Sequence, residues 1–202
     1  MRLLGRAAHR GRLACGLPVA VVVSIACSGC GGSTPQPVAK VQGRPVSARQ
    51  LSHWTKIKRA EAQASPTGTP ASAAALRARA LAFLLTAYWL EGEATARGVA
   101  VSPAEAETNL SHLLSSPAGP ALTASLRRRH MSRADELLVL RLDALAQKLR
   151  TKVGAGGSSA DRARRIAAFI AAYRTRWKQR TTCERGYVIA ECREGPPLAE
   201  GE

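Results

Sequence analysis

Apolar residues spaced three or four positions apart recur through most of the chain, and this spacing predicts a series of amphipathic helices. The clearest stripe places Leu76, Ala80 and Leu84 on one face of a segment of about 25 residues. The pattern predicts helices over about residues 47–64, 72–97, 103–114, 118–129, 133–152 and 160–180.

Polar residues with capping character mark where these helices begin. Ser47 is followed three positions later by Gln50, and Ser102-Pro103 is followed by Glu105, so both segments have the pattern of a capped N-terminus. Ser132 precedes the next apolar stripe in the same way. Gly98 supplies a stop signal after the long second helix.

Two segments depart from the helical pattern. Residues 38–46 alternate between apolar and polar side chains around Gly43, which predicts a strand and a tight turn. Residues 153–159 are rich in glycine and serine and predict a flexible linker. We therefore expect a mainly α fold with a short strand and turn at its N-terminal edge.

The first 29 residues have the pattern of a secretory signal, because they contain no acid and have four arginines before an apolar run from Leu13 to Ala26. Small residues then precede a cysteine and a polar stretch follows it, which resembles a bacterial lipobox. Cys30 is the first choice for the lipidated residue and Cys27 the alternative. An uncleaved single-pass anchor is the other interpretation, because the run just reaches the shortest length of a spanning helix. Both interpretations predict an extracytoplasmic domain tethered to the outer face of the cell membrane.

The other two cysteines, Cys183 and Cys192, are close together near the C-terminus. In an oxidising compartment, such a pair predicts a small disulfide loop. Two free thiols are the alternative.

The chain is strongly basic, with 30 Lys and Arg against 14 Asp and Glu. Removal of residues 1–29 leaves 26 basic residues and 14 acidic ones, so the exported part is itself basic. Export argues against nucleic acid as a partner. A lipid anchor plus a basic surface instead favours contact with an anionic membrane or cell-wall polymer.

No motif identifies an enzyme. The sequence contains no zinc-ligand array, phosphate-binding loop or nucleophile elbow, so we expect no metal and no cofactor. His53, His112 and His130 are scattered, and Glu91 and Glu93 are two positions apart on a helix, where their side chains point to different faces.

Several local segments together resemble the chaperone domain of SurA/PrsA-type foldases, which are exported proteins that hold unfolded chains. The matching segments are Val38 to Val46, Tyr88 to Ala94, Gly98 to Glu105, Leu140 to Asp143, Lys148 to Arg150, and Phe169 to Cys192. In complete foldases, a parvulin prolyl-isomerase domain is inserted before the last helix, where this chain has only Gly154 to Ser159. The resemblance therefore implies a SurA/PrsA-like helical chaperone domain that lacks parvulin catalysis.

This resemblance implies a membrane-anchored holdase for unfolded or extended exported polypeptides, and Trp54, Tyr88 and Trp89 are the candidate client contacts. Core packing is the alternative role for each of them. A prolyl isomerase, acting alone or with a partner, and a structural wall-binding lipoprotein are the other functions considered. The expected organisation is a signal peptide (1–29), a tether (30–37), a helical chaperone domain (38–153), a linker (154–159), a C-terminal helix and disulfide loop completing the same domain (160–195), and a tail (196–202).

Overall fold

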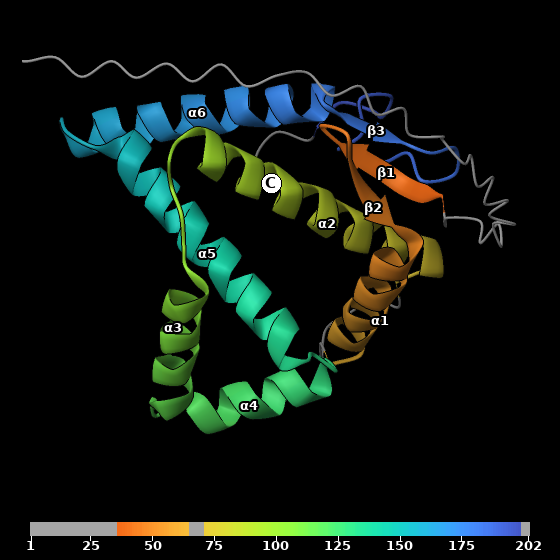
Figure 1. Ribbon diagram of the computed structural model, residues 1–202, viewed down its shortest axis with the longest axis horizontal. Coiled ribbons are helices and arrows are strands. Elements are labelled where there is room, and N and C mark those ends of the chain that lie inside the picture. The colour runs from red at the N-terminus through yellow and green to blue at the C-terminus, as the bar shows by residue number, and fades with distance from the viewer. Residues whose placement is uncertain (1–35, 65–70, 199–202) are drawn as a thin grey trace, which may run out of the picture. The chain divides into compact units, whose positions relative to one another are not determined.

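The computed structural model describes residues 36–64 and 71–198, and residues 34–202 form a compact unit of their own. The signal segment and both candidate lipidation residues, Cys27 and Cys30, lie outside the described residues. The described chain is mainly helical, with a small sheet at one edge (Figure 1).

The sheet joins the two ends of the described chain. Strands β1 (Pro37–Val41) and β2 (Arg44–Ser47) form an antiparallel hairpin, and β3 (Thr181–Cys183) pairs antiparallel with the other edge of β1. The turn between β1 and β2 contains Gln42 and Gly43, both at positive φ, as two-residue hairpin turns require. The sequence pattern predicted this strand and turn, whereas the three-residue β3 was too short to predict.

Within the described residues, six helices follow the predicted order, and their bounds differ from the expected ones by a few residues. Side chains of Ser47, Ser72, Ser102 and Ser132 accept the expected hydrogen bonds from the backbone at the helix starts. The helices are α1 (Ala48–Ala64), α2 (Ala73–Ala96), α3 (Pro103–Ser115), α4 (Gly119–Arg128), α5 (Arg133–Gly154) and α6 (Ser159–Gln179).

The glycine-rich joint is shorter than its composition predicted. Helix α5 continues through Gly154, and Ser158 forms a capping box with Asp161 at the start of α6, so only residues 155–158 connect the two helices. A side chain at Gly154 would collide with the stem of Arg162, so the glycine permits close approach of the helices here. The sequence pattern predicted a linker over residues 154–159, and the two helices extend into this segment from both ends.

Helix α2 carries most of the core. Leu81, Leu84, Leu85 and Trp89 pack with β1, α1 and Trp177 of α6 in one buried cluster. Among the described residues, α2 is the one helix long and apolar enough to cross a membrane by length and composition. Its many buried side chains are those of a core helix.

The close contact between α2 and α6 depends on Gly92. A β-carbon added at this position would overlap the ring of Trp177, with the ring atom Cζ2 only 2.7 Å away. Trp177 is 3 % exposed and packs in the main core cluster, so the ring has little room to move.

Substitution Gly92→Ala is expected to lower the free energy of unfolding by about 1–3 kcal/mol, because the added methyl group displaces Trp177. Urea unfolding followed by circular dichroism measures this loss. Thr95→Ala, at an exposed position on the same helix, is the control and should change stability by less than about 0.5 kcal/mol. An unchanged or raised stability of Gly92→Ala would show that the α2–α6 contact adjusts freely.

Candidate functional site

A buried carboxylate joins α2 to α6. Glu93 is 2 % exposed, and its two oxygens accept hydrogen bonds from Arg97 at 2.6 Å, from the Trp177 indole N–H at 2.9 Å and from Arg176. Both oxygens of the carboxylate therefore accept hydrogen bonds, as a buried charge requires. Glu91 points elsewhere and pairs with Arg44 and Arg141, as the spacing of the two acids predicted.

Burial, charges and hydrogen bonds at the contact between α2 and α6 keep Glu93 and Tyr173 each in one protonation state. Burial raises the pKa of Glu93, but the hydrogen bonds from Arg97, Trp177 and Arg176 outweigh it and hold the pKa below the usual value of 4.5. Burial, followed by the charge of Glu93, raises the pKa of the Tyr173 hydroxyl well above its usual value. Glu93 is thus charged and Tyr173 neutral at physiological pH.

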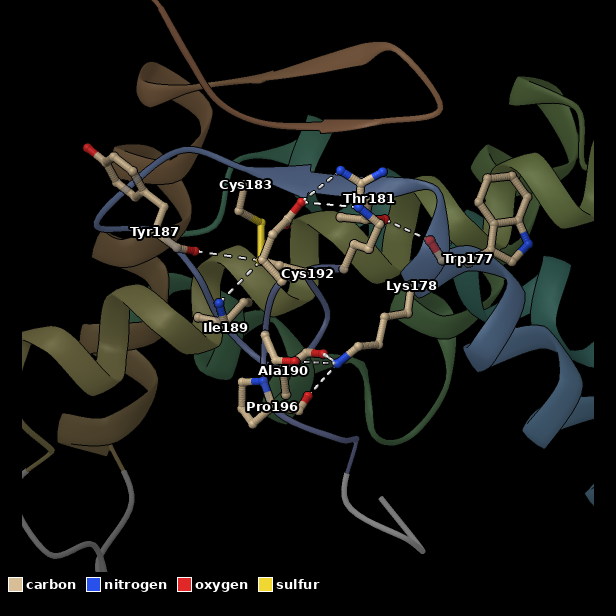
Figure 2. The surroundings of a disulfide bond; sticks show 12 residues. Trp177, Lys178, Thr181, Cys183, Tyr187, Ile189, Ala190, Cys192 and Pro196 are labelled. Atoms are coloured by element: carbon tan, nitrogen blue, oxygen red, sulfur yellow. Dashed lines mark hydrogen bonds and ion pairs between the residues drawn. A yellow bond between two sulfur atoms is a disulfide. The ribbon is translucent and has the colours of Figure 1, made fainter.

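The C-terminal segment is fastened to the end of α6. Cys183 and Cys192 form the predicted disulfide, with their Cα atoms 5.8 Å apart, and Thr181 accepts a hydrogen bond from the Trp89 indole at 2.7 Å. Lys178 donates to three carbonyl oxygens of this segment, those of Ala190, Gly195 and Pro196 (Figure 2). These contacts direct residues 195–198 back toward the helices.

A groove of about 370 Å³ lies between α2, α5 and α6. Its walls are mostly apolar and its rim carries Arg150, Arg174 and Glu191. Figure 1 shows α5 and α6 diverging from their joint, with α2 passing between them. The apolar lining residues are Trp89, Leu90, Leu149, Phe169, Ile170 and Tyr173.

The chain's own C-terminal segment borders this groove. Leu198 contributes to the lining, two residues beyond the Pro196 carbonyl that Lys178 holds. Residues 196–198 have no regular secondary structure and include two consecutive prolines, which favour an extended backbone. The sequence analysis predicted only a tail over residues 196–202, so it did not identify Leu198 as a residue of the groove.

The three residues proposed from sequence as client contacts belong to the main core cluster or pack against it, and they do not line one common groove. Trp89 is 1 % exposed and forms part of the groove wall, while its indole N–H is bonded to Thr181. Trp54 is buried against Phe83, with ring centroids 4.1 Å apart. Tyr88 is half-buried, and its hydroxyl contacts Gln50 and the Pro45 carbonyl.

Trp54 instead borders a second groove of about 300 Å³. Charged side chains surround it, and Lys58 and Arg129 both pair with Glu61 there. Leu113, with 39 % of its surface exposed, is the most accessible apolar residue of its lining. The second groove is framed mainly by α1, α3, α4 and α5, so it is separate from the first.

The residues of the first groove that sequence reasoning missed are Phe169, Ile170 and Tyr173. The sequence does contain a signal for them, because their spacing places all three on one face of α6 together with Trp177. Of these four residues, only Trp177 is fully buried. The other three are half-buried because no further helix covers them in the described part of the chain.

The titratable groups of the described residues do not form a metal site. Within residues 36–64 and 71–198, no three His, Cys, Asp or Glu side chains gather at ligand spacing. His53 lies 2.8 Å from Asp135 and links α1 to the start of α5, where Asp135 also caps the helix. This pair stabilises a helix junction.

Comparison with protein-family models, with curated proteins and with solved structures found no match for this chain. The resemblance to SurA/PrsA-type foldases is therefore neither supported nor opposed by known relatives.

Because the pKa of Glu93 is lowered in the folded chain, its contribution to stability is complete above the usual carboxyl range and is lost as the pH falls below about 4.5. Substitution Glu93→Gln should lower stability at pH 7 by about 1–3 kcal/mol, because hydrogen bonds to a charged acceptor are lost. It should also flatten the decline of stability below pH 5.

Denaturant unfolding of the wild type and the variant from pH 3 to 7 checks both effects. Glu91→Gln is the matched control, because its ion pairs are longer and more exposed, and it should cost less than about 1 kcal/mol. Equal acid slopes for wild type and Glu93→Gln would contradict the assignment.

Proposed function

We propose that the protein is a membrane-anchored extracytoplasmic holdase that binds extended apolar segments of unfolded exported polypeptides in the α2–α5–α6 groove. The observation that carries this proposal is the groove itself, with half-buried Leu90, Phe169 and Ile170 in its walls and charged residues on its rim. Apolar surface with a polar rim is typical of surfaces that bind other polypeptides.

The volume of the α2–α5–α6 groove suits apolar side chains of a client. A volume of about 370 Å³ lies within the range of pockets that bind small ligands, so it can accept a few apolar side chains. The ring of Phe169 is stacked with Tyr173 and covered by the Arg97 guanidinium at 4.6 Å. These contacts hold the aromatic wall in place before a client arrives, which reduces the ordering cost of binding.

The C-terminal segment supports the same function. Gly195 to Leu198 reaches the groove as a chain without regular secondary structure, and Leu198 lies in its lining. The groove therefore already contacts an apolar side chain presented by such a chain. A client would bind beside this segment or replace it.

Membrane anchoring forms part of the proposal and derives from the sequence. The signal pattern and the lipobox-like cysteines, Cys30 or Cys27, predict a lipid tether. The Cys183–Cys192 disulfide is consistent with an oxidising compartment. Palmitate labelling of the wild type and of Cys30→Ser and Cys27→Ser variants would test this part separately.

The holdase proposal is tested with residues 34–202 after their cooperative unfolding has been verified. We expect this unit to slow the aggregation of a reduced, unfolded model client at equimolar concentration. Acceleration of cis–trans exchange in a proline peptide would instead support the isomerase interpretation. Inactivity in both assays would contradict the holdase proposal.

Substitution Ile170→Gln is expected to weaken client binding about fivefold, because it removes part of the apolar burial that one such side chain supplies. Fluorescence anisotropy of a labelled unfolded client gives the dissociation constant. Leu113→Gln removes an exposed apolar residue from the second groove, and Val188→Gln removes one that lines neither groove. Both controls should leave affinity unchanged, and a loss in Leu113→Gln alone would place the site in the second groove.

Deletion of residues 197–202 is expected to strengthen client binding severalfold if the client replaces Leu198. The deletion keeps Pro196 and therefore the carbonyls that Lys178 holds, so the disulfide loop stays anchored. Leu198→Ala in the full unit should give part of the same gain. Weaker binding after the deletion would show that the segment forms a required wall of the site.

A further inference from the structure

A second surface combines exposed cations with an exposed valine and a half-buried tyrosine. Along α1, Ala48, Ser52, Lys56 and Arg59 follow at helical spacing on the side next to the buried stripe. Together with Arg77 of α2 they line a shallow hollow, and all three cations are exposed. We call this surface, with the adjoining loop 186–189, the α1 basic face.

The loop adds apolar contact to the cations. Tyr187 lines the same hollow as Lys56 and Arg59, and it lines an adjacent hollow with Arg77 and Val188. Val188 has 44 % of its surface exposed, the largest fraction among the large apolar residues of the described chain. An amphipathic tyrosine and an exposed aliphatic residue beside cations are suited to a membrane–water boundary.

The cations of the α1 basic face are not neutralised by the protein. In the described ranges, Lys56, Arg59 and Arg77 have no ion pair, whereas neighbouring Lys58 lies 2.9 Å from Glu61. No acidic side chain lines either hollow. The face therefore presents a positive potential to solvent.

The α1 basic face lies next to the start of the described chain, and this position favours the membrane as its partner. The described chain enters the domain at β1, where Pro37 pairs with Ser47, the residue that immediately precedes α1. Residues 30–36 span at most about 24 Å when extended, and Lys56 lies about 12 Å along the axis of α1 from Ala48. A chain anchored at Cys30 or Cys27 would thus keep the α1 basic face within reach of the bilayer surface.

We propose that the α1 basic face docks onto the headgroup layer of an anionic lipid bilayer. Lys56, Arg59 and Arg77 contact lipid phosphates, while Val188 and the Tyr187 ring enter the interfacial region. This contact would add an electrostatic contribution to the attachment that the lipid anchor supplies. The α2–α5–α6 groove shares no lining residue with this face, so a docked domain can still bind a client.

The inference rests on the proposed membrane attachment and is independent of client binding. The test uses the full chain incorporated into vesicles of phosphatidylcholine, with or without 30 % phosphatidylglycerol, and measures acetylation of each lysine by mass spectrometry. Flotation of the vesicles reports attachment, and acetylation reports docking, so failure of one is distinguished from failure of the other.

We expect acetylation of Lys56 to slow at least fivefold in the anionic vesicles relative to the neutral ones, and this protection to disappear in 0.5 M salt. Lys148, which pairs with Glu105 on another surface, should change less than twofold. The variant Arg59→Gln/Arg77→Gln should abolish the protection of Lys56. The matched variant Arg127→Gln/Arg128→Gln, which removes the same charge from exposed positions of α4, should retain it.

Three outcomes would overturn the proposal. One is equal reactivity of Lys56 in both kinds of vesicle when flotation shows attachment. Another is protection that Arg127→Gln/Arg128→Gln removes as effectively as Arg59→Gln/Arg77→Gln, which would indicate general charge attraction. The third is equal protection by soluble polyphosphate in neutral vesicles, which would assign the face to a phosphate polymer.

Discussion

The arrangement of the domain depends on one buried carboxylate. Glu93 accepts hydrogen bonds from Arg97 in its own helix and from Arg176 and Trp177 in α6, so it fixes α6 across α2. Gly92 makes room for the Trp177 ring at the same level. Because α6 leads directly into β3, this junction also sets the position of the strand that completes the sheet.

The groove is a consequence of that junction. Helix α6 is held at its C-terminal end by Glu93 and at its N-terminal end by the close contact of Gly154 with Arg162. Between these two points, Phe169 and Ile170 line the groove together with Leu90 and Leu149. An apolar surface remains half-exposed there because the ends of α6 are fixed and its middle has no further cover in the described chain. This is the structural basis of the proposed client binding.

The two proposed surfaces have separate functions and are formed by different parts of the domain. The groove lies between α2, α5 and α6, while the α1 basic face is formed by α1, the start of α2 and the loop 186–189. The disulfide loop connects them, since its Tyr187 and Val188 belong to the basic face and its Glu191 lines the groove. The Cys183–Cys192 bond therefore constrains a segment that borders both surfaces.

The sequence by itself determined the elements whose causes are local. Capping by Ser47, Ser102 and Ser132 acts over three residues, and the apolar spacing that defines each helix repeats within two turns. For the same reason, the hairpin at Gly43 and the short disulfide loop could be predicted.

Only the tertiary structure decided which of these faces meet. The bond from Trp177 to Glu93 joins residues 84 positions apart, and β3 is a strand only because β1 lies beside it. Trp54 is a core residue, Trp89 lines the groove, and Ile170 is half-buried. These differences depend on which helices pack over each side chain. Periodicity shows that a helix has an apolar face. Whether that face is buried depends on an element that is distant in sequence, and local spacing does not identify that element.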